Sequence, residues 1–364
     1  MRGFRRGTAH LRRFMTTLTR TPETFDYVIV GAGAAGAILA HRLSEDRQAT
    51  VCLLEAGGRD WHPWLHIPAG FIKVLFNPAY TWQFSSEPHE QTLGRRVPLP
   101  QGRVLGGSSS INGLVYNRGQ REDYDDWSAL GNRGWSYAEV LPYFRRTERR
   151  TAGDSAYRGR DGLLPVSDID WHHPVNEAFI AGAQGIGMPR NADYNGATQA
   201  GVGYFQRTID QGWRMSTSRT FLRPAQGRPN LTIRTQAQAT RIVIEDRRAV
   251  GVRYATDQQR ETLREVRARR EVIVCAGAIN TPRLLQISGI GDADHLQTLG
   301  VRVAHHLPGV GQNLQDHLDL FVFDLKFDGD VASVARADMP ICPLRTMDGD
   351  MPSAAAPILA VRPP

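Results

Sequence analysis

A glycine-rich turn near the N-terminus constrains the fold of this sequence more than any other feature. Three glycines with the spacing G-x-G-x-x-G, Gly31, Gly33 and Gly36, directly follow a β-prone run at residues 25–30 and open an alanine-rich helical stretch. A second β-rich run ends at Glu55, 19 residues after the last of these glycines. In a βαβ unit that binds a dinucleotide, such glycines allow the tight turn, the approach of a pyrophosphate and close helix packing, and the acid accepts hydrogen bonds from a ribose. The pattern therefore predicts a parallel sheet that binds a dinucleotide at the N-terminus of its first helix.

A second glycine-rich turn, GRVLGGSSSIN at residues 102–112, indicates a further contact with the same ligand. Gly106 and Gly107 free the backbone, and Ser108 is the first of three hydroxyl donors before a helix that we expect to begin at Ile111. Successive N–H groups in such a turn form a concavity that binds anions. Alone, the turn could be a helix cap; behind a nucleotide-binding unit, we expect it to close over the cofactor.

Length and composition exclude several classes of protein. At 364 residues the chain is long for one domain, which predicts two. No apolar run approaches the roughly 20 residues of a membrane span, so no transmembrane segment is predicted. The net charge of +7 comes from arginines scattered along the chain, which argues against a nucleic-acid partner because a binding surface would cluster them. Three distant cysteines, Cys52, Cys275 and Cys342, predict free thiols in a reducing compartment and hence a cytoplasmic protein.

Three segments lack a regular period. Residues 1–24 carry six arginines and no acid before Glu23, which fits a transit peptide or an upstream start codon with Met15 as the true start; both predict a disordered extension. Residues 61–79, rich in aromatics and proline, predict a lid or interface or, equally, a structural excursion. No metal site is predicted, because the histidines of this stretch have no cysteine or acid at metal spacing. The polar residues 147–170 predict a domain boundary or an exposed crossover.

The remaining elements are predicted from periodicity and from start and stop signals. Helices are expected over residues 124–146 with a break at Pro142, over 175–185, from Thr281 with Pro282 in the first turn, and over 292–299. Strands at 231–234, 239–245 and 250–254 are expected to form a small antiparallel meander, with a buried strand at 271–275 and a closing strand at 301–304.

Three motifs make the chain similar to the glucose–methanol–choline (GMC) oxidoreductases, and to their choline dehydrogenase-like members. GRVLGGSSSING, followed by Tyr116, resembles the first signature of that family, and residues 277–291 (GAINTPRLLQISGIG) resemble the second. LPGVGQNLQDHLD, at residues 307–319, resembles the crossover segment that follows. Together with the N-terminal fingerprint, the resemblance covers residues 25–320. It implies FAD as cofactor rather than NAD, and an α/β fold: an FAD-binding Rossmann-like (βαβ) domain with a small antiparallel meander and an incomplete α+β substrate domain.

The resemblance also implies a division of the chain and a set of cofactor-binding residues. After the disordered extension 1–24, residues 25–150 and 225–318 would form the FAD-binding domain, and residues 151–224 and 319–364 a partial substrate-binding domain whose C-terminal part is missing. The first glycine turn and Glu55 would hold the ADP half, the second turn the pyrophosphate and ring side, Asn112 would lie near the flavin ring, and the backbone of Ala239 would pair with adenine. The full implied set is Gly31, Gly33, Ala34, Ala35, Gly36, Glu55, Arg103, Val104, Gly106, Gly107, Ser108, Asn112, Gly113, Ala239, Ala276 and Gly277.

The chemistry that the family resemblance implies is oxidation of the CH–OH group of an alcohol by hydride transfer to flavin N5. A histidine with a histidine or asparagine partner would take the hydroxyl proton, a task suited to imidazole. These residues would lie beyond Pro364, so the catalytic residues are unknown and this chain, which resembles a truncated or frameshifted gene, is not expected to turn over an alcohol. His305, His306 and His317 are predicted to be structural.

The alternative to an alcohol oxidoreductase is an inactive flavin-binding fragment or pseudoenzyme, while an NAD-dependent dehydrogenase fits only the first glycine turn. The implied partners are a small-molecule alcohol substrate and an electron acceptor that the sequence does not identify.

Overall fold

The computed structural model describes residues 22–256, 263–316 and 359–362. Contacts between residues divide the chain into two compact units. The first comprises the described residues up to Asn112 together with those of Gln211–Leu314, and the second comprises Gly113–Asp210 and the described residues beyond Leu314. The functional domain boundaries expected at residues 150 and 224 stay a prediction. Residues 1–21, which make up most of the expected extension, and Cys342 lie outside the described residues.

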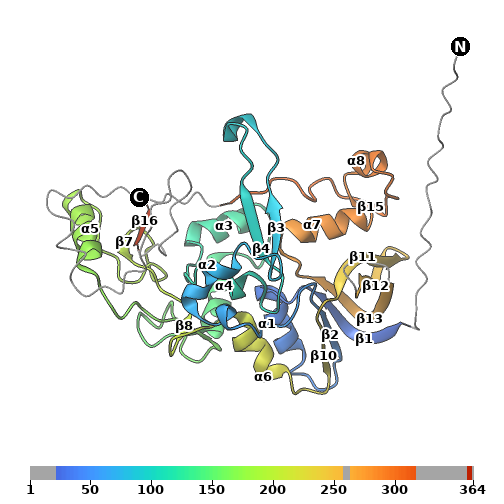
Figure 1. The fold of residues 1–364 in the computed structure, drawn as a ribbon, viewed down its shortest axis with the longest axis horizontal. Coiled ribbons are helices and arrows are strands. Elements are labelled where there is room, and N and C mark those ends of the chain that lie inside the picture. The colour runs from blue at the N-terminus through green and yellow to red at the C-terminus, as the bar shows by residue number, and fades with distance from the viewer. Residues whose placement is uncertain (1–21, 257–262, 317–358, 363–364) are drawn as a thin grey trace, which may run out of the picture. The chain divides into compact units, whose positions relative to one another are not determined.

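A six-stranded sheet is the framework of the first unit (Figure 1). Its first four strands are parallel, and the last two run antiparallel to their neighbours, which confirms the α/β class with a Rossmann-like βαβ start. In sheet order the strands are β10 (Leu231–Arg234), β2 (Val51–Leu54), β1 (Glu23–Val30), β13 (Leu263–Val274), β12 (Arg248–Ala255) and β11 (Gln238–Glu245). The helices of this unit are α1 (Ala34–Leu43), α2 (Phe71–Val74), α6 (Arg223–Ala225), α7 (Gly277–Ile287) and α8 (Ala293–Thr298). Short helical turns are η1 (Pro63–Leu65), η2 (Pro68–Gly70), η3 (Glu90–Thr92), η4 (Gly107–Ser110) and η5 (Ser218–Leu222). The smaller strands are β3 (Thr81–Ser85), β4 (Pro98–Gly102), β9 (Trp213–Arg214), β14 (Ile290–Gly291) and β15 (His305–His306).

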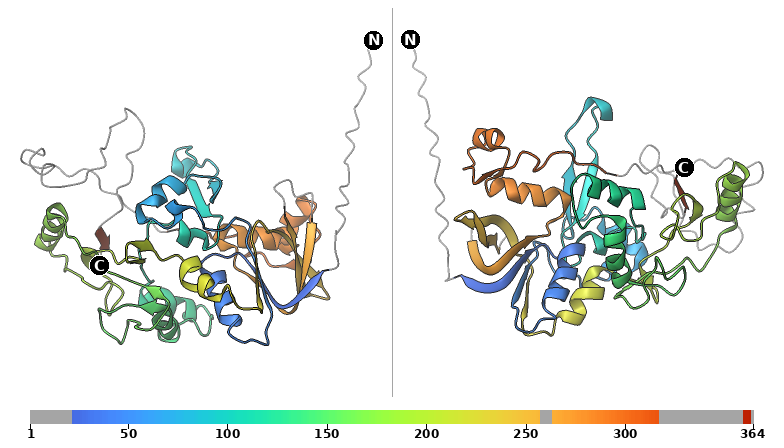
Figure 2. Two further views of the ribbon diagram at one scale, coloured as in Figure 1. Left: turned by 60° about the horizontal axis from the view of Figure 1, so that its bottom comes forward. Right: turned by 180° about the vertical axis from the view of Figure 1, so that it is seen from behind.

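Two apolar clusters form because side chains alternate between the two faces of β1 and β2. Val28 and Cys52 belong to one cluster, which includes Leu284 of α7. Ile29 and Leu53 belong to the other, which includes alanines of α1 and residues of η5 and α6, the helical segments seen together in Figure 2. Because both faces of these strands are covered, their sequences are continuous apolar runs.

The predicted meander is wrong in one strand. Residues 231–234 form β10, which pairs parallel with β2 at the opposite edge of the sheet from β11. The chain then crosses the end of β2, where Gln236 N donates to Gly57 O and Ala237 N donates to Glu55 O. The antiparallel part instead comprises β11, β12 and residues 263–267 of β13, whose residues 266–274 pair with β1. The strand predicted at 271–275 is therefore only the end of a twelve-residue strand.

Four other predicted elements differ from the structure. No helix begins at Ile111; η4 ends there because the carbonyls that a longer helix would use accept hydrogen bonds from Arg214 instead. Helix α7 begins at Gly277, so Pro282 lies inside it rather than at its start. The expected closing strand at 301–304 is instead the two-residue strand β15 at 305–306, which pairs with β14. The fourth difference is in the second unit, where two glycines in the left-handed region, Gly131 and Gly134, divide the predicted helix 124–146 into two.

The described part of the second unit contains three helices and short strands. Its helices are α3 (Arg121–Ala129), α4 (Tyr137–Thr147) and α5 (Pro174–Gly185). Its strands are β5 (Glu148–Arg149), β6 (Leu164–Pro165), β7 (Gly201–Tyr204), β8 (Ile209–Asp210) and β16 (Leu359–Arg362), of which β16 pairs with β7. Helix α5 begins within one residue of its predicted start, and its buried Ile180 and Ala183 pack with Val202 of β7.

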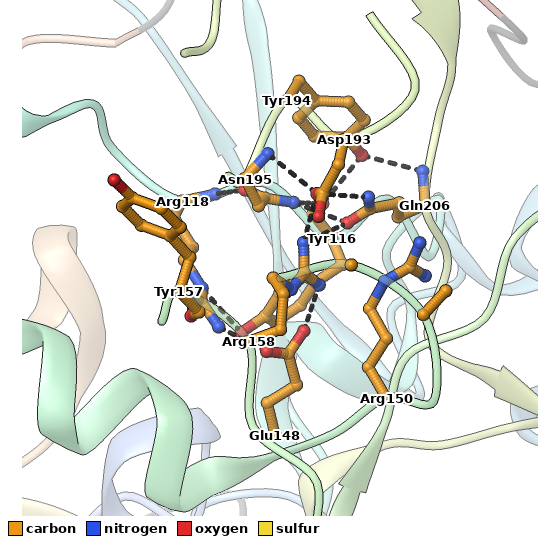
Figure 3. Close-up of polar contacts among 12 residues, drawn as sticks. Tyr116, Arg118, Glu148, Arg150, Tyr157, Arg158, Asp193, Tyr194, Asn195 and Gln206 are labelled. Carbon is orange, nitrogen blue, oxygen red and sulfur yellow. Dashed lines mark hydrogen bonds and ion pairs between the residues drawn. The ribbon is translucent and has the colours of Figure 1, made fainter. Parts of the chain in front are cut away.

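A buried network of charged and amide groups occupies the interior of the second unit (Figure 3). Glu148 is completely buried and accepts hydrogen bonds from the guanidinium groups of Arg118 and Arg158. Arg158 also donates to Asp193, at 2.6 Å, and to Gln206, at 2.9 Å. The expectation that residues 147–170 form an exposed crossover is therefore wrong for the charged residues of this network, because opposite charges satisfy one another inside the unit.

No helix in the described ranges is both long enough and apolar enough to cross a membrane.

Candidate functional site

The first unit contains a cavity of about 550 Å³, within the usual size range of ligand pockets. It lies at the carboxyl ends of β1, β2 and β13, where open α/β sheets bind their ligands. Its walls come from both glycine turns, the start of β11, helix α7 and the β3–β4 hairpin.

The first glycine turn forms the wall at the end of β1. Gly31 has φ of +96°, and a Cβ there would collide with the carbonyl of Cys275; a Cβ at Gly36 would collide with the carbonyl of Gly31. Helix α1 begins after Gly33 with no side chain capping it, so its first N–H groups have no partner within the helix. Ala34 and Ala35 of this first turn line the cavity. The positive end of the helix dipole and these free N–H groups suit a phosphate.

Glu55 lies at the end of β2 and lines the cavity while being 5% exposed. Its carboxylate accepts hydrogen bonds from Ala32 N at 2.9 Å and from Gly57 N at 2.8 Å. Burial raises the pKa of Glu55 to about 7, against the opposing effect of these N–H groups and of the charge of Arg103. Each carboxylate oxygen has a second lone pair, so the group can fix the turn and still accept hydrogen bonds from a ligand hydroxyl.

The second glycine turn contacts the first. Gly106 and Gly107 have φ of +89° and +53°, and a Cβ on Gly107 would lie 2.6 Å from the Cα of Gly33. Gly107 and Ser108 line the cavity, and the Ser108 hydroxyl accepts a hydrogen bond from Gly102 N at 3.0 Å. The two turns, remote in sequence, thus form one continuous backbone surface. A residue larger than glycine at position 107 would prevent this close contact.

The other walls come from β11, α7 and the hairpin. Ala239 of β11 and Ala276 and Gly277, at the start of α7, line the cavity as the sequence predicts. Trp82 and Phe84 of β3 stack with their ring centroids 6.0 Å apart and also line it. These two aromatics were not predicted, although their spacing of two in a strand places both on one face.

The other predicted residues lie outside the cavity lining. Gly36, Arg103, Val104, Gly106 and Asn112 belong to the first unit but do not line the cavity, and Gly113 belongs to the second unit. Val104 is completely buried in a separate apolar cluster. Arg103 lies with its Cζ 4.8 Å from the ring centroid of Trp82, and its buried Nε has no hydrogen-bond partner among the described residues. Their assignment to a cofactor stays a prediction.

His305 and His306 do not line this cavity. His305 and His306 are exposed in β15, and His306 Nδ1 accepts a hydrogen bond from Ala293 N at 3.0 Å. His317 lies outside the described residues. Within the described ranges, no group of three or more histidine, cysteine or acidic side chains is placed to hold a metal ion.

Comparisons with known proteins place this geometry in context. A model of the family GMC oxidoreductase matches residues 25–319. The chain is 45% identical over 309 residues to the mitochondrial choline dehydrogenase of Mus musculus, covering 82% of this chain and 51% of that protein. It is 45% identical over 296 residues to an oxygen-dependent choline dehydrogenase of Sinorhizobium fredii, covering 81% of this chain and 53% of that protein. The chain spans about half the length of these curated relatives.

Solved structures resemble the fold as well. The crystal structure of pyridoxine 4-oxidase from Mesorbium loti has a TM-score of 0.76 and 35% identity, covering 80% of this chain and 57% of that one. A fungal aryl-alcohol oxidase has a TM-score of 0.71 and 26% identity, covering 81% of this chain and 52% of that one.

Proposed function

Because the chain belongs to the GMC oxidoreductase family, we propose that its first unit binds FAD and that the protein serves the oxidation of an alcohol CH–OH group. The observation that carries this proposal is the contact between the two glycine turns beside the uncapped end of α1. A diphosphate needs such a surface of backbone N–H groups, with no side chain in the way. When bound, FAD would supply the electron-accepting ring that takes a hydride from the alcohol.

The residues of the cavity fit the parts of FAD. The free N–H groups at Ala34 and Ala35, with Gly107 and Ser108, would hold the diphosphate. Glu55 would accept hydrogen bonds from the ribose, and the Ala239 backbone would meet the adenine. The fit is supported by the charge of Arg103, which does not line the cavity itself but lies with its Cζ 4.8 Å from the ring centroid of Trp82 in the cavity wall, and whose buried Nε has no hydrogen-bond partner among the described residues. Gly36 would contribute through packing, because it lets α1 approach the turn.

The substrate that we propose is a small-molecule alcohol. The relatives and structural neighbours are named for choline, pyridoxine and aryl alcohols, so these compounds are the first to test. We leave the electron acceptor unassigned. The free thiols of Cys52 and Cys275 support a reducing compartment, as in the cytoplasm.

Titration of the purified apoprotein with FAD tests the cofactor, by quenching of flavin fluorescence and competition with ADP. We expect saturable binding that ADP reverses. Anaerobic mixing of the loaded protein with choline, pyridoxine and benzyl alcohol then tests the reaction through bleaching of flavin absorbance. A protein that does not bind FAD would contradict the proposal entirely. A protein that binds FAD and leaves it oxidised with every alcohol would agree with the expectation that this chain does not turn over an alcohol and would support the inactive flavin-binding alternative.

A further inference from the structure

A completely buried arginine lies directly behind the second glycine turn. Arg214, in β9, donates from its Nη1 to the carbonyl of Asn112 at 2.7 Å, to the side-chain Oδ1 of the same residue at 2.8 Å, and to the carbonyl of Ser109 at 3.3 Å. Ser109 lines the cavity, whereas Arg214 does not. The guanidinium is therefore one residue behind the cavity wall, where it can act on a ligand through Ser109.

The residues that follow Arg214 hold the same turn. Thr217 N donates to the hydroxyl of Ser109 at 3.0 Å, and that hydroxyl donates to the carbonyl of Gly106 at 2.6 Å. A Cβ on Gly106 would lie 3.2 Å from the backbone nitrogen of Ser218. The turn is thus held between residues 214–218, which contact Gly106 and Ser109, and the first glycine turn, which contacts Gly107.

The charge of Arg214 has no counter-ion among the described residues. Its Nε and Nη2 are buried without a hydrogen-bond partner there, and no carboxylate contributes to its electrostatic environment. Burial lowers the pKa of Arg214 to about 10, which leaves the group positive at neutral pH. A buried cation without a partner is unfavourable, and an unsatisfied buried group calls for an explanation. An anionic ligand at Ser108 and Ser109 would supply one, because a charge in a dry interior acts over a longer distance than in water.

We propose that Arg214 is a positioning residue for the second glycine turn: it fixes residues 106–112 in the shape that receives the diphosphate of the cofactor. The inference rests on the proposed function. Loss of the stabilisation that one charge-assisted hydrogen bond gives to the turn corresponds to a fall in affinity of about 10- to 100-fold.

Three variants test the inference. R214K keeps the charge but cannot reproduce the planar guanidinium, and R214M keeps an unbranched stem without the charge. R47M is the matched control, because Arg47 is an exposed arginine of the same unit on the loop between α1 and β2. The measurements are the Kd for FAD, the visible circular dichroism of the bound flavin, and the far-ultraviolet spectrum of each apoprotein.

We expect the Kd for FAD to rise about tenfold in R214K and further in R214M, with an altered flavin dichroism in both and no change in R47M. An unchanged Kd and unchanged dichroism in both Arg214 variants would overturn the inference. If both variants lose their far-ultraviolet signal, Arg214 is required for folding rather than positioning, and the inference is wrong. If only one Arg214 variant folds, the Kd for FAD and the flavin dichroism of that variant alone decide whether the inference stands. A wild-type chain that fails to bind FAD would overturn the proposed function itself, and the inference with it.

Discussion

Different interactions stabilise the interiors of the two units: apolar packing in the first and a buried network of charged groups in the second. The sheet of the first unit is buried between apolar clusters, in which Ile29 and Leu53 are completely buried. The interior of the second unit contains Glu148 and Arg158, which are equally buried but charged. An apolar core loses stability in proportion to the volume removed, whereas a buried ion network fails when one partner leaves the others uncompensated. The two units should therefore respond differently to substitutions of similar size.

The largest expected effect is in the charged interior. E148A removes the described carboxylate partner of Arg118 and leaves the buried Arg158 with Asp193 alone, and we expect a loss of about 3–5 kcal/mol in the free energy of unfolding. Urea denaturation measures it. The matched control is R149A, because the neighbouring Arg149 is half exposed and pairs with Asp210 at the surface, where such a pair contributes at most about 1 kcal/mol. Equal losses in the two variants would show that the network does not hold the unit together.

The apolar interior of the first unit should lose less when a single side chain is truncated. L53A creates a cavity in β2 between β1 and β10, and we expect a loss of about 2–4 kcal/mol. Leu93, which is 84% exposed, provides the control L93A, for which no loss is expected. If L53A lowers the free energy of unfolding more than E148A does in the same urea titration, the expectation that the charged interior is the more sensitive of the two is wrong.

A third change tests the close backbone contact between the two glycine turns of the first unit. G107A places a Cβ against the Cα of Gly33 and forces alanine into the left-handed region, with a strain of about 1–3 kcal/mol. We expect a weaker FAD complex, by about tenfold or more, in a fluorescence titration. G94A is the control for strain alone, since Gly94 has φ of +73° with no atom within 4 Å of the added Cβ. Similar FAD affinities in the two variants would contradict the close contact between the turns.

The smallest effect concerns the one buried charge of the first cavity that has a raised pKa. The pKa of Glu55 in the folded apoprotein is raised to about 7 by burial, so its carboxylate fraction falls as the pH drops below 7. The ionised form is the acceptor for a ribose, so FAD affinity should fall by up to about tenfold from pH 8 to pH 6. The stability of the apoprotein should change in the opposite direction. Between pH 4.5, the ordinary pKa of a glutamate, and pH 7, the folded state holds more protons than the unfolded state, so stability decreases as the pH rises through this range.

Titrations of wild type and E55Q with FAD across this pH range measure the effect. We expect E55Q to bind FAD with an affinity that is independent of pH, because the amide does not titrate. A wild-type profile as flat as that of E55Q would show that Glu55 does not titrate in the apoprotein or does not contact the ligand.

Sequence reasoning predicts a structural feature when the interacting residues lie close together along the chain, and misses it when they lie far apart. The turn at Gly31 and the position of Glu55 are predictable because strand, turn, helix and acid lie within one short βαβ stretch. The end of η4 at Ile111 is not predictable, because the side chain that takes its carbonyls is Arg214, about a hundred residues later. The network around Glu148 is missed for the same reason. Isolated charges resemble a solvated surface until the fold brings their partners together.

The long strand β13 has a consequence for the synthesis of this protein. Val30 of β1 pairs with Val274 of β13, so the middle of the central sheet cannot close until 244 further residues have left the ribosome. At about 5–20 residues per second, β1 and β2 remain without that neighbour for roughly 12 to 50 s. During this interval the apolar edge of β1 is open to other chains, and the wall of the cavity that follows β13 does not yet exist. The residues after β13 that line the cavity are thus synthesised long after the first glycine turn, so the complete cavity cannot form early in synthesis.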